Sequence, residues 1–589
     1  MASKRKRLDV KDGLIVILLL VITVISMFTF FSTCKLCIQS DGFFHFSRAE
    51  EIYQNLRKGV PFTFIATHTF QQTGVGNFLF YPDVFLYPWA LLRFIFKPVL
   101  AFYVWDSLFV FLTFVIGYFC MRDYSGDRLR SVLFSIIYGL GTYHIYLGQY
   151  NFVLGEFIAY TFLPLVVLGI YHVVFSDEKK WYLLAIGLAL LTYSHVLSVY
   201  IMVLFSLTVM ICALFFRTWI NKKRIFAIVK AFGLYCALSA WIFVPFITDY
   251  IGKGIFTPKG GFLFLSSPQQ MIERSFTPNV AVAMQSIGLV AMLTAFVGWF
   301  FVRRNEREIV TYVIGVSLLL MATTFVPYSR IENISWLTKI LGVIQFPYRF
   351  LSLATLFLSI TASLIVVMII RRIGSNKISR FGILALCLGG IMVYYYSEQT
   401  PVVSRLTAPT SKYLRSTKTP PASYQELINE APGKIVNNQN YNNIFDYEVL
   451  FGQTDYYPER AFAIHPQWGS FAPRAFSTQR HVAYVNNVPT KVVPLEFPNK
   501  LSYILNLRKT TTVDLPVIAY KNTKVYDNGK RIVRKESVRG TVEVHLAKGH
   551  HQVTACYVPS KMYYILLLLA LFAWGALAIN LLYSYRKNK

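Results

Sequence analysis

Long apolar runs recur along most of the 589-residue chain, and many of them are about as long as a helix that crosses a bilayer. The clearest runs cover 14–33, 98–120, 131–149, 152–175, 198–217, 225–247, 280–302, 309–326, 349–370 and 561–583, and two weaker runs cover 181–196 and 381–397. A further stretch, 84–96, is too short to span, so we expect it at the interface or partway into the membrane. The pattern predicts a polytopic α-helical membrane protein with about twelve transmembrane helices.

The distribution of charged residues indicates how these spans are oriented in the membrane. Hydrophobic residues make up 55% of the chain and charged residues only 15%, which is too little charge for a soluble protein of this length. The net charge of +29 would suit nucleic acid, but the basic residues gather in short loops between the apolar runs. These clusters lie at 4–7, 122–130, 179–180, 222–224, 303–304, 371–372 and 586–587. With both termini in the cytoplasm and the first span as an uncleaved anchor, every cluster falls inside, so no nucleic-acid partner is expected.

The same topology divides the chain into three parts. Residues 1–397 are expected to form the multi-spanning membrane domain, with the first external loop at 34–83. Residues 398–560 are expected to form an extracytoplasmic domain, and 561–589 the last span and a cytoplasmic tail.

The outer domain changes character along its length. It is polar and turn-prone at first, and from about residue 479 it reads as short strands, which predicts a β-sandwich. These strands lie at 481–485, 501–507, 513–520, 524–526, 531–533, 540–546 and 551–557, with a hairpin turn at 527–530. The domain carries 20 Lys and Arg against 12 Asp and Glu, which suits an anionic partner outside the cell.

Candidate chemistry begins in the first external loop. Asp41, His45 and Arg48 are spaced so that they share one face of a helix. A carboxylate backed by an imidazole and a guanidinium could take a proton from an incoming hydroxyl. The alternative is an amphipathic helix on the membrane surface whose charged side chains are only solvated.

Later polar residues fall near the external ends of other spans, so they are candidates to line the same site. Glu156 lies inside its span, where an ionisable side chain is usually paired or functional. His195 could contact a lipid phosphate or be a hydrogen-bonded structural histidine, and Gln149 and Tyr150 lie at a neighbouring helix end. Arg349 breaks the positive-inside pattern, and its guanidinium suits either a phosphate contact or a position among the lipid headgroups.

Several of these motifs together resemble the YfhO-like branch of the GT-C membrane glycosyltransferases. They are Asp41-x3-His45-x2-Arg48, Gly59, Gly74-x-Gly76, Phe80-Tyr81-Pro82, Gly148-Gln149-Tyr150 leading to Pro164-Leu165, and Gln345-Phe346-Pro347-Tyr348-Arg349. A β-rich domain before the last helix belongs to the same resemblance, which covers nearly the whole chain in order. The chain departs from the pattern at Asp83, where such proteins often repeat proline.

The resemblance implies a function for these residues. The donor would be a polyprenyl-phosphate-linked sugar, and the acceptor an extracytoplasmic polysaccharide, teichoic-acid-like polymer or glycolipid. Asp41 would be the general base of an inverting transfer, and Arg349, helped by His45 or Arg48, would bind the donor phosphate. The sequence names no cofactor, gives no metal-ligand set and leaves the need for a divalent metal open.

Two other functions remain open at this point. Spans with both termini inside also suit a non-enzymatic flippase or transporter of lipid-linked saccharides, although no repeated halves are visible in the sequence. A polysaccharide polymerase would share the donor class and act on longer chains.

Overall fold

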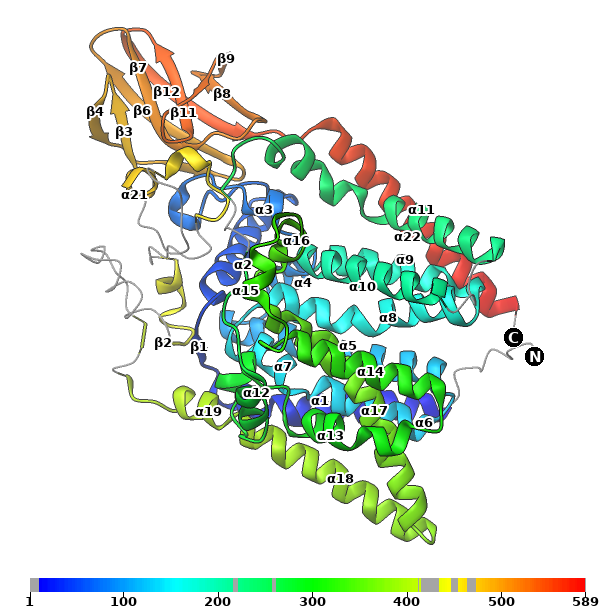
Figure 1. The fold of residues 1–589 in the computed structure, drawn as a ribbon. Helices are drawn as coiled ribbons and strands as arrows, with labels where there is room; N and C mark the ends of the chain where they lie inside the picture. Colours follow the sequence, from blue (N-terminus) through cyan, green and yellow to red (C-terminus); the bar gives the residue numbers. More distant parts are fainter. Residues whose placement is uncertain are drawn as a thin grey trace.

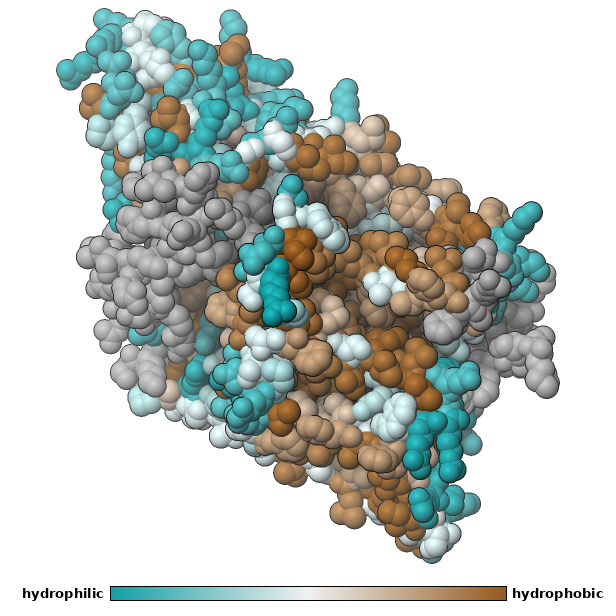
Figure 2. Space-filling model, in the orientation of Figure 1, coloured by the Kyte–Doolittle hydropathy of each residue, from teal (hydrophilic) through white to brown (hydrophobic). Residues whose placement is uncertain are grey.

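A computed structural model describes residues 10–215, 221–256, 261–410, 413–414, 434–445, 454–462 and 473–587. The chain forms a large helical body and a β-rich domain that precedes the last helix (Figure 1). Brown, apolar side chains cover much of the helical face drawn in Figure 2, whereas hydrophilic side chains cover most of the β-rich domain. The predicted fold class, a polytopic α-helical membrane protein with a β-rich domain before its last helix, is confirmed.

Eight helices in the described ranges are long and apolar enough to cross a membrane. They are α1 (Val10–Thr33), α5 (Pro98–Ser125), α8 (Leu154–Phe175), α10 (Val196–Phe215), α11 (Lys222–Pro245), α17 (Phe350–Ile373), α18 (Lys377–Glu398) and α22 (Lys561–Lys587). Each coincides with one of the apolar runs, including the weaker run at 381–397. The helix α1 begins and α22 ends on the side of the body away from the β-rich domain (Figure 1).

The remaining four runs form shorter or interrupted helices. They become α6 (Arg128–Gly139) with α7 (Thr142–Ile145) and the π-helical turn η2 (Tyr146–Tyr150), then α9 (Tyr182–Thr192), η5 (Val280–Gln285) with α13 (Leu289–Val302), and α14 (Glu306–Met321). Gly141 interrupts the first of these because its φ of −63° and ψ of 138° are extended. Only eight of the expected twelve or so segments are therefore full-length apolar helices in the described residues.

The first external loop folds into the protein and does not lie on its surface. It contains β1 (Leu36–Ile38), α2 (Gly42–Arg57), η1 (Phe70–Gln72) and α3 (Asn77–Phe80), and it leads to the seven-residue helix α4 (Leu86–Leu92). Every residue of α2 from Gly42 to Ile52 is buried. The alternative of a surface helix with solvated charges is therefore wrong.

Short elements connect the later helices to one another, and the last three of those named here connect α18 to the β-rich domain. They are α12 (Pro268–Ser275), α15 (Tyr328–Glu332), α16 (Ser335–Leu341), the 3-10 turn η7 (Pro347–Arg349), α19 (Thr400–Leu406), β2 (Lys434–Val436) and α21 (Pro473–Gln479). The strand β2 pairs antiparallel with β1, so this part of the outer region is tied to the first external loop.

The β-rich domain contains two five-stranded antiparallel sheets. Their orders are β10-β11-β7-β3-β4 and β5-β6-β12-β8-β9. The strands are β3 (Val482–Val485), β4 (Val488–Lys491), β5 (Leu495–Phe497), β6 (Lys500–Leu507), β7 (Thr511–Ile518), β8 (Thr523–Asp527), β9 (Lys530–Ile532), β10 (Lys535–Glu536), β11 (Thr541–Leu546) and β12 (Gly549–Tyr557). All seven predicted strands are present. The predicted hairpin joins β8 and β9, with positive φ at Asn528 and Gly529 as this two-residue turn requires.

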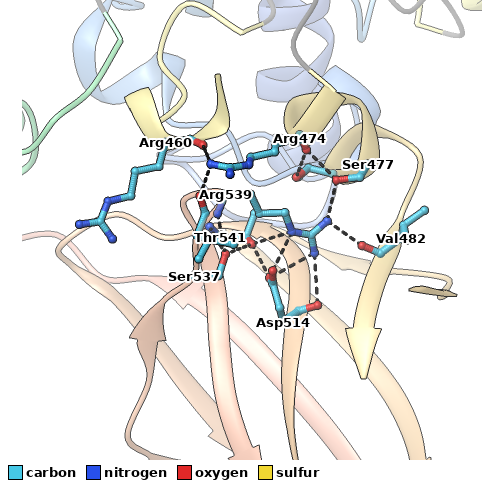
Figure 3. A network of polar contacts seen from close by, with 10 residues as sticks. Arg460, Arg474, Ser477, Val482, Asp514, Ser537, Arg539 and Thr541 are labelled. Carbon is cyan, nitrogen blue, oxygen red and sulfur yellow. Dashed lines mark hydrogen bonds and ion pairs between the residues drawn. The ribbon is translucent and has the colours of Figure 1, made fainter. Parts of the chain in front are cut away.

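A buried ion pair attaches α21 to the first sheet (Figure 3). The Arg539 side chain is 2% exposed and donates to both carboxylate oxygens of Asp514, at 2.9 and 3.1 Å. The same guanidinium donates to Ser477 Oγ at 3.0 Å and to the Val482 carbonyl at 2.8 Å. These partners satisfy the buried charge, so the network is structural.

The sandwich is bonded to the helical body at several points. Asp249, beyond the end of α11, accepts from the Asn522 backbone at 3.0 Å, the Asn522 amide at 2.7 Å and the Tyr557 hydroxyl at 2.9 Å. The Asn499 side chain bridges the backbone of the first external loop, accepting from Phe64 N and donating to Phe62 O, both at 2.7 Å. The outer domain thus helps to shape the loop that carries the candidate site.

Candidate active site

Asp41 is the one exposed residue at the start of a buried helix. It occupies the N-cap position of α2, and its carboxylate caps no backbone N–H. The side chain is accessible to solvent, whereas the residues that follow it are buried. The protein around the carboxylate nevertheless removes most of its hydration, and this desolvation raises the pKa of Asp41 to about 6. The hydrogen bond from the Ser40 hydroxyl and the charge of Arg349 act in the opposite direction and lower the pKa. An accessible carboxylate of this kind can accept a proton near neutral pH.

Arg349 is held at the entrance of α17 by its own loop. Its Nη1 donates to the Ile344 carbonyl at 2.6 Å and to Gln345 Oε1 at 3.2 Å, and its guanidinium lies 4.6 Å from the centroid of the Phe346 ring. Gln345 has a φ of 63°, a strained conformation for a residue other than glycine. The Nε atom is buried and has no hydrogen-bond partner among the described residues. A buried donor without a partner is expected to have one when a ligand is bound.

Glu156 lies beside Arg349 and is already engaged. Its Oε2 lies 3.8 Å from Arg349 Nε, and both side chains are at most 10% exposed. Its Oε1 accepts from Tyr143 OH at 3.0 Å and from Ser352 Oγ at 2.8 Å. Glu156 therefore orients the guanidinium, and its hydrogen bonds make it less suited than Asp41 to accept a proton. Tyr143 and Ser352 were not candidates from the sequence, because nothing in it brings residues so far apart together.

The electrostatics join these residues into one site. The charge of Arg349 lowers the pKa of Asp41, so the two side chains lie within range of each other. The hydroxyls of Tyr81, Tyr146 and Tyr348 are also within electrostatic range of the Asp41 carboxylate. The charge of Arg349 thus acts on the Asp41 carboxylate although the two residues lie 308 positions apart in the sequence, and their roles as base and phosphate ligand stay predictions.

The Arg48 guanidinium is bound by backbone carbonyls of the protein itself. It is completely buried, and its Nη2 donates to the carbonyls of Tyr81 at 2.7 Å and Pro82 at 2.9 Å. The guanidinium also lies 4.7 Å from the centroid of the Tyr81 ring. Arg48 therefore fixes the turn that follows α3, and a phosphate contact by this residue stays a prediction.

His45 and His195 both lie close to the Tyr81 ring. The His45 ring centroid is 5.5 Å and the His195 ring centroid 5.8 Å from that of Tyr81. Burial, and then the charge of Arg48, hold the pKa of His45 well below its usual range, so this imidazole is neutral. Neither of its ring nitrogens has a hydrogen-bond partner among the described residues. His195 is hydrogen-bonded to Ser198 Oγ at 2.8 Å, which matches the structural alternative for that residue.

Gln149 belongs to a second buried cluster. Its amide nitrogen lies 3.5 Å from Asp106 Oδ2, and its carbonyl oxygen accepts from Gln399 at 3.2 Å. Tyr150 lies against Arg405, whose guanidinium is 5.1 Å from the ring centroid. The hydrogen bonds of Gln149 thus lead away from Asp41, whereas the Tyr150 ring also stacks on Tyr146, at 6.0 Å between centroids. Asp106 escaped the sequence analysis because it lies within a long apolar run.

Apolar cavities lie below the Arg349 side chain. A small one is lined by Glu156, Arg349 and Ser352 together with Tyr160 and Met202. A larger one, of about 380 Å³, is lined by the next turns of the same three helices, α8, α10 and α17, together with α14 and parts of α5 and α6. The two cavities are lined by successive turns of α8, α10 and α17, and the small one, of about 10 Å³, has room for about one water molecule.

Another apolar cavity lies against the loop that follows α1, the loop that also carries Asp41. It has a volume of about 400 Å³ and is lined by residues 61–64, by 78–87 and by side chains of α11 and α22. Tyr81 forms part of its wall. Asp83, the residue that departs from the family pattern, is its only charged lining residue in the described part of the chain. Burial raises the pKa of Asp83 to about 7, and nearby Arg48 opposes that shift.

No family model matches the sequence, and no curated protein matches it. Among solved structures, the chain is similar to the arabinofuranosyltransferase AftD from mycobacteria, with a TM-score of 0.40 and 14% identity over 66% of this chain and 27% of that one. It is also similar to ArnT from Cupriavidus metallidurans bound to undecaprenyl phosphate, with a TM-score of 0.29 and 10% identity over 59% of this chain and 77% of that one. The chain thus spans about a quarter of AftD. These likenesses are too weak to carry a function, which must rest on the residues of the site.

Among the described residues, no three His, Cys, Asp or Glu side chains gather in a way that could hold a metal ion. The site as described consists of the accessible Asp41 carboxylate, the Arg349 guanidinium with Glu156 beside it, and several tyrosine hydroxyls. Such a set can activate a hydroxyl and bind a phosphate.

Proposed function

We propose that the chain is a membrane glycosyltransferase of the GT-C type, of the YfhO-like branch, that moves a sugar from a polyprenyl-phosphate donor to an extracytoplasmic acceptor. One observation carries this proposal. The accessible carboxylate of Asp41 lies within electrostatic range of Arg349, whose buried Nε lacks a hydrogen-bond partner in the described structure, and the helix α17 that follows Arg349 lines a mostly apolar cavity of about 380 Å³. A base, a phosphate-binding cation and a cavity for a lipid chain are the parts that this transfer needs.

The residues imply the following reaction. The Asp41 carboxylate accepts the proton of the acceptor hydroxyl, and the acceptor oxygen forms a bond to the anomeric carbon of the donor sugar. The bond between that carbon and the phosphate oxygen breaks on the opposite face, so the configuration inverts and polyprenyl phosphate leaves. Arg349 stabilises the charge that develops on the departing phosphate, and Glu156 keeps the guanidinium in place.

The donor chain fits the larger cavity below Arg349. From Arg349 to Ile360, the last lining residue on α17, the helix rises about 16 Å at 1.5 Å per residue. The lining is formed almost entirely by apolar and aromatic side chains, so a prenyl chain would be buried there while its phosphate remained at the guanidinium.

We further propose that the protein lies in the cell membrane with both termini in the cytoplasm, and that the site and the sandwich face outward. Single cysteines at positions 127 and 440, in intact cells treated with a membrane-impermeant thiol reagent, test this orientation. Labelling at 440 and none at 127 is expected. Labelling at 127 alone would reverse the orientation.

A reconstitution assay separates the enzyme from a flippase. Purified protein given a polyprenyl-phosphate sugar should release polyprenyl phosphate, and a suitable envelope acceptor should accelerate the release. A flippase would instead move the intact lipid across liposomes, and a polymerase would lengthen its product with every cycle. Translocation without cleavage over a range of acceptors would refute the glycosyltransferase. The Asp41→Asn variant is the matched control, because it keeps the size of the side chain and loses the base.

A further inference from the structure

The cavity behind Tyr81 has no role in the reaction described so far. Its volume of about 400 Å³ is in the range of small-molecule sites. The wall is strongly aromatic, with Phe78, Tyr81, Trp241, Tyr563 and Trp574 among its residues. Tyr81 is also within electrostatic range of Asp41, so this cavity adjoins the candidate active site.

The cavity opens toward the bilayer. Two spans, α11 and α22, form one side of it, and they lie next to each other in Figure 1. On α22, Ala570 is 2% exposed and faces the interior, whereas Leu571 is 60% exposed and lies at the edge of the same cavity. The lining of the cavity therefore reaches the apolar, outward-facing side of α22, where acyl chains of a bilayer would contact the protein.

The charge of this cavity is opposite to that of the proposed donor site. Its lining contains Asp83 and no cation, whereas the small cavity near the donor phosphate contains Arg349. The Asp83 side chain accepts hydrogen bonds from hydroxyl groups when it is ionised and can donate one when it is protonated, and the lining offers a phosphate no cation. The occupant that fits best is consequently an amphiphile whose head group carries hydroxyls and no phosphate next to its chains.

We propose that the acceptor is itself anchored in the membrane, as a neutral glycolipid of the diacylglycerol-glycoside class, with its chains between α11 and α22 and a head-group hydroxyl at Asp83. This inference rests on the proposed function and names its acceptor. Tyr81 then separates the two lipids, with the donor phosphate at Arg349 on one side and the acceptor chains on the other. Because Tyr81 lines the same cavity as Asp83 and is also within electrostatic range of Asp41, the reacting hydroxyl belongs to the distal part of the head group.

The first test measures binding without turnover. Full-length protein in liposomes is photolabelled with a diacylglycerol glycoside that carries a diazirine in one acyl chain. The same chains on phosphatidylglycerol serve as the anionic comparison. The glycolipid should label α11 and α22 at least tenfold more than the phospholipid does. Equal labelling by both probes would mean ordinary annular lipid and would overturn the proposal.

Two pairs of variants locate the site. Ala570→Trp should fill the cavity and abolish labelling, whereas Gly575→Trp is the control on the same helix, since a side chain there meets nothing within 4 Å. Asp83→Leu should remove the preference for the glycolipid, and Asp83→Asn, which keeps a hydrogen-bond acceptor, should largely restore it. Unchanged labelling in Ala570→Trp, or an unchanged preference in Asp83→Leu, would refute this location.

The second test distinguishes failure of this inference from failure of the enzyme assignment. Polyprenyl phosphate release is measured with the glycolipid and with its water-soluble head group alone. Much faster release with the intact glycolipid supports the inference. Equal rates would overturn the membrane-anchored acceptor and leave the glycosyltransferase standing. Specific labelling without cleavage by any acceptor would instead refute the enzyme and retain a lipid site.

Discussion

The Asp41 carboxylate gives the sharpest test of the proposed reaction, because its environment predicts a pH profile. Desolvation raises its pKa to about 6, and the proposed reaction needs the ionised form. The base is then about nine-tenths ionised at pH 7 and about one-tenth ionised at pH 5. The kcat/KM for transfer should therefore fall roughly tenfold between these pH values, with an inflection near 6 that belongs to the free enzyme.

Substitution separates the base from other titrating groups. Asp41→Asn should lower kcat/KM by about 10²–10⁴-fold at pH 7, which is the usual contribution of a general base, and should flatten the acid limb of the profile. Arg349→Ala should move the inflection upward, because the Arg349 charge now lowers the pKa of Asp41. The direction of this second shift follows from the structure alone.

The assay follows release of radiolabelled polyprenyl phosphate from pH 5 to 8 under subsaturating donor. Folding of each variant is checked by its elution and thermal transition in detergent. An acid limb that persists in Asp41→Asn would assign the titration to another group. An inflection that moves downward in Arg349→Ala would show that the two side chains do not interact as described.

Three further outcomes are expected. Arg349→Lys should raise the KM for the donor more than tenfold, because an ammonium does not reproduce the forked guanidinium, and unchanged donor dependence would make Arg349 only a headgroup anchor. Gly155→Ala should displace Tyr81, because the added Cβ would overlap the Tyr81 hydroxyl, and should lower both activity and stability by about 1–3 kcal/mol. Gly233→Ala is the matched control and should be neutral, because its Cβ meets nothing within 4 Å. Asp249→Ala should loosen the sandwich by about 1–3 kcal/mol per unpaired donor, seen as faster proteolysis of the outer domain with the helical body intact.

The contacts of the sandwich also affect what a variant that lacks this whole domain would report. Asn499 holds the backbone at Phe62 and Phe64, and the Tyr520 hydroxyl accepts from Gly76 N at 2.8 Å. Removal of the outer domain would thus release the loop that carries the site. Loss of activity in such a deletion would report on loop structure as well as on acceptor binding, so point substitutions are the better test.

The sequence by itself determined the spans and the strands, because each depends on local pattern. A run of apolar residues must form a helix in a bilayer, since the backbone has no other way to satisfy its polar groups there. Alternating and β-branched residues around Asn528 and Gly529 likewise predicted the strands and the hairpin of the sandwich. The pairing of Asp41 with Arg349 was expected only from the resemblance, since spacing alone cannot relate them.

Tertiary structure alone decided which polar residues share a site and what each one does. Packing buried α2, turned Arg48 toward the carbonyls of Tyr81 and Pro82, and placed Glu156 beside Arg349. It shortened or broke four of the apolar runs, one of them at the extended backbone of Gly141. Contacts between residues hundreds of positions apart depend on how the helices cross, and the order of residues along a single chain does not encode that crossing in any local pattern.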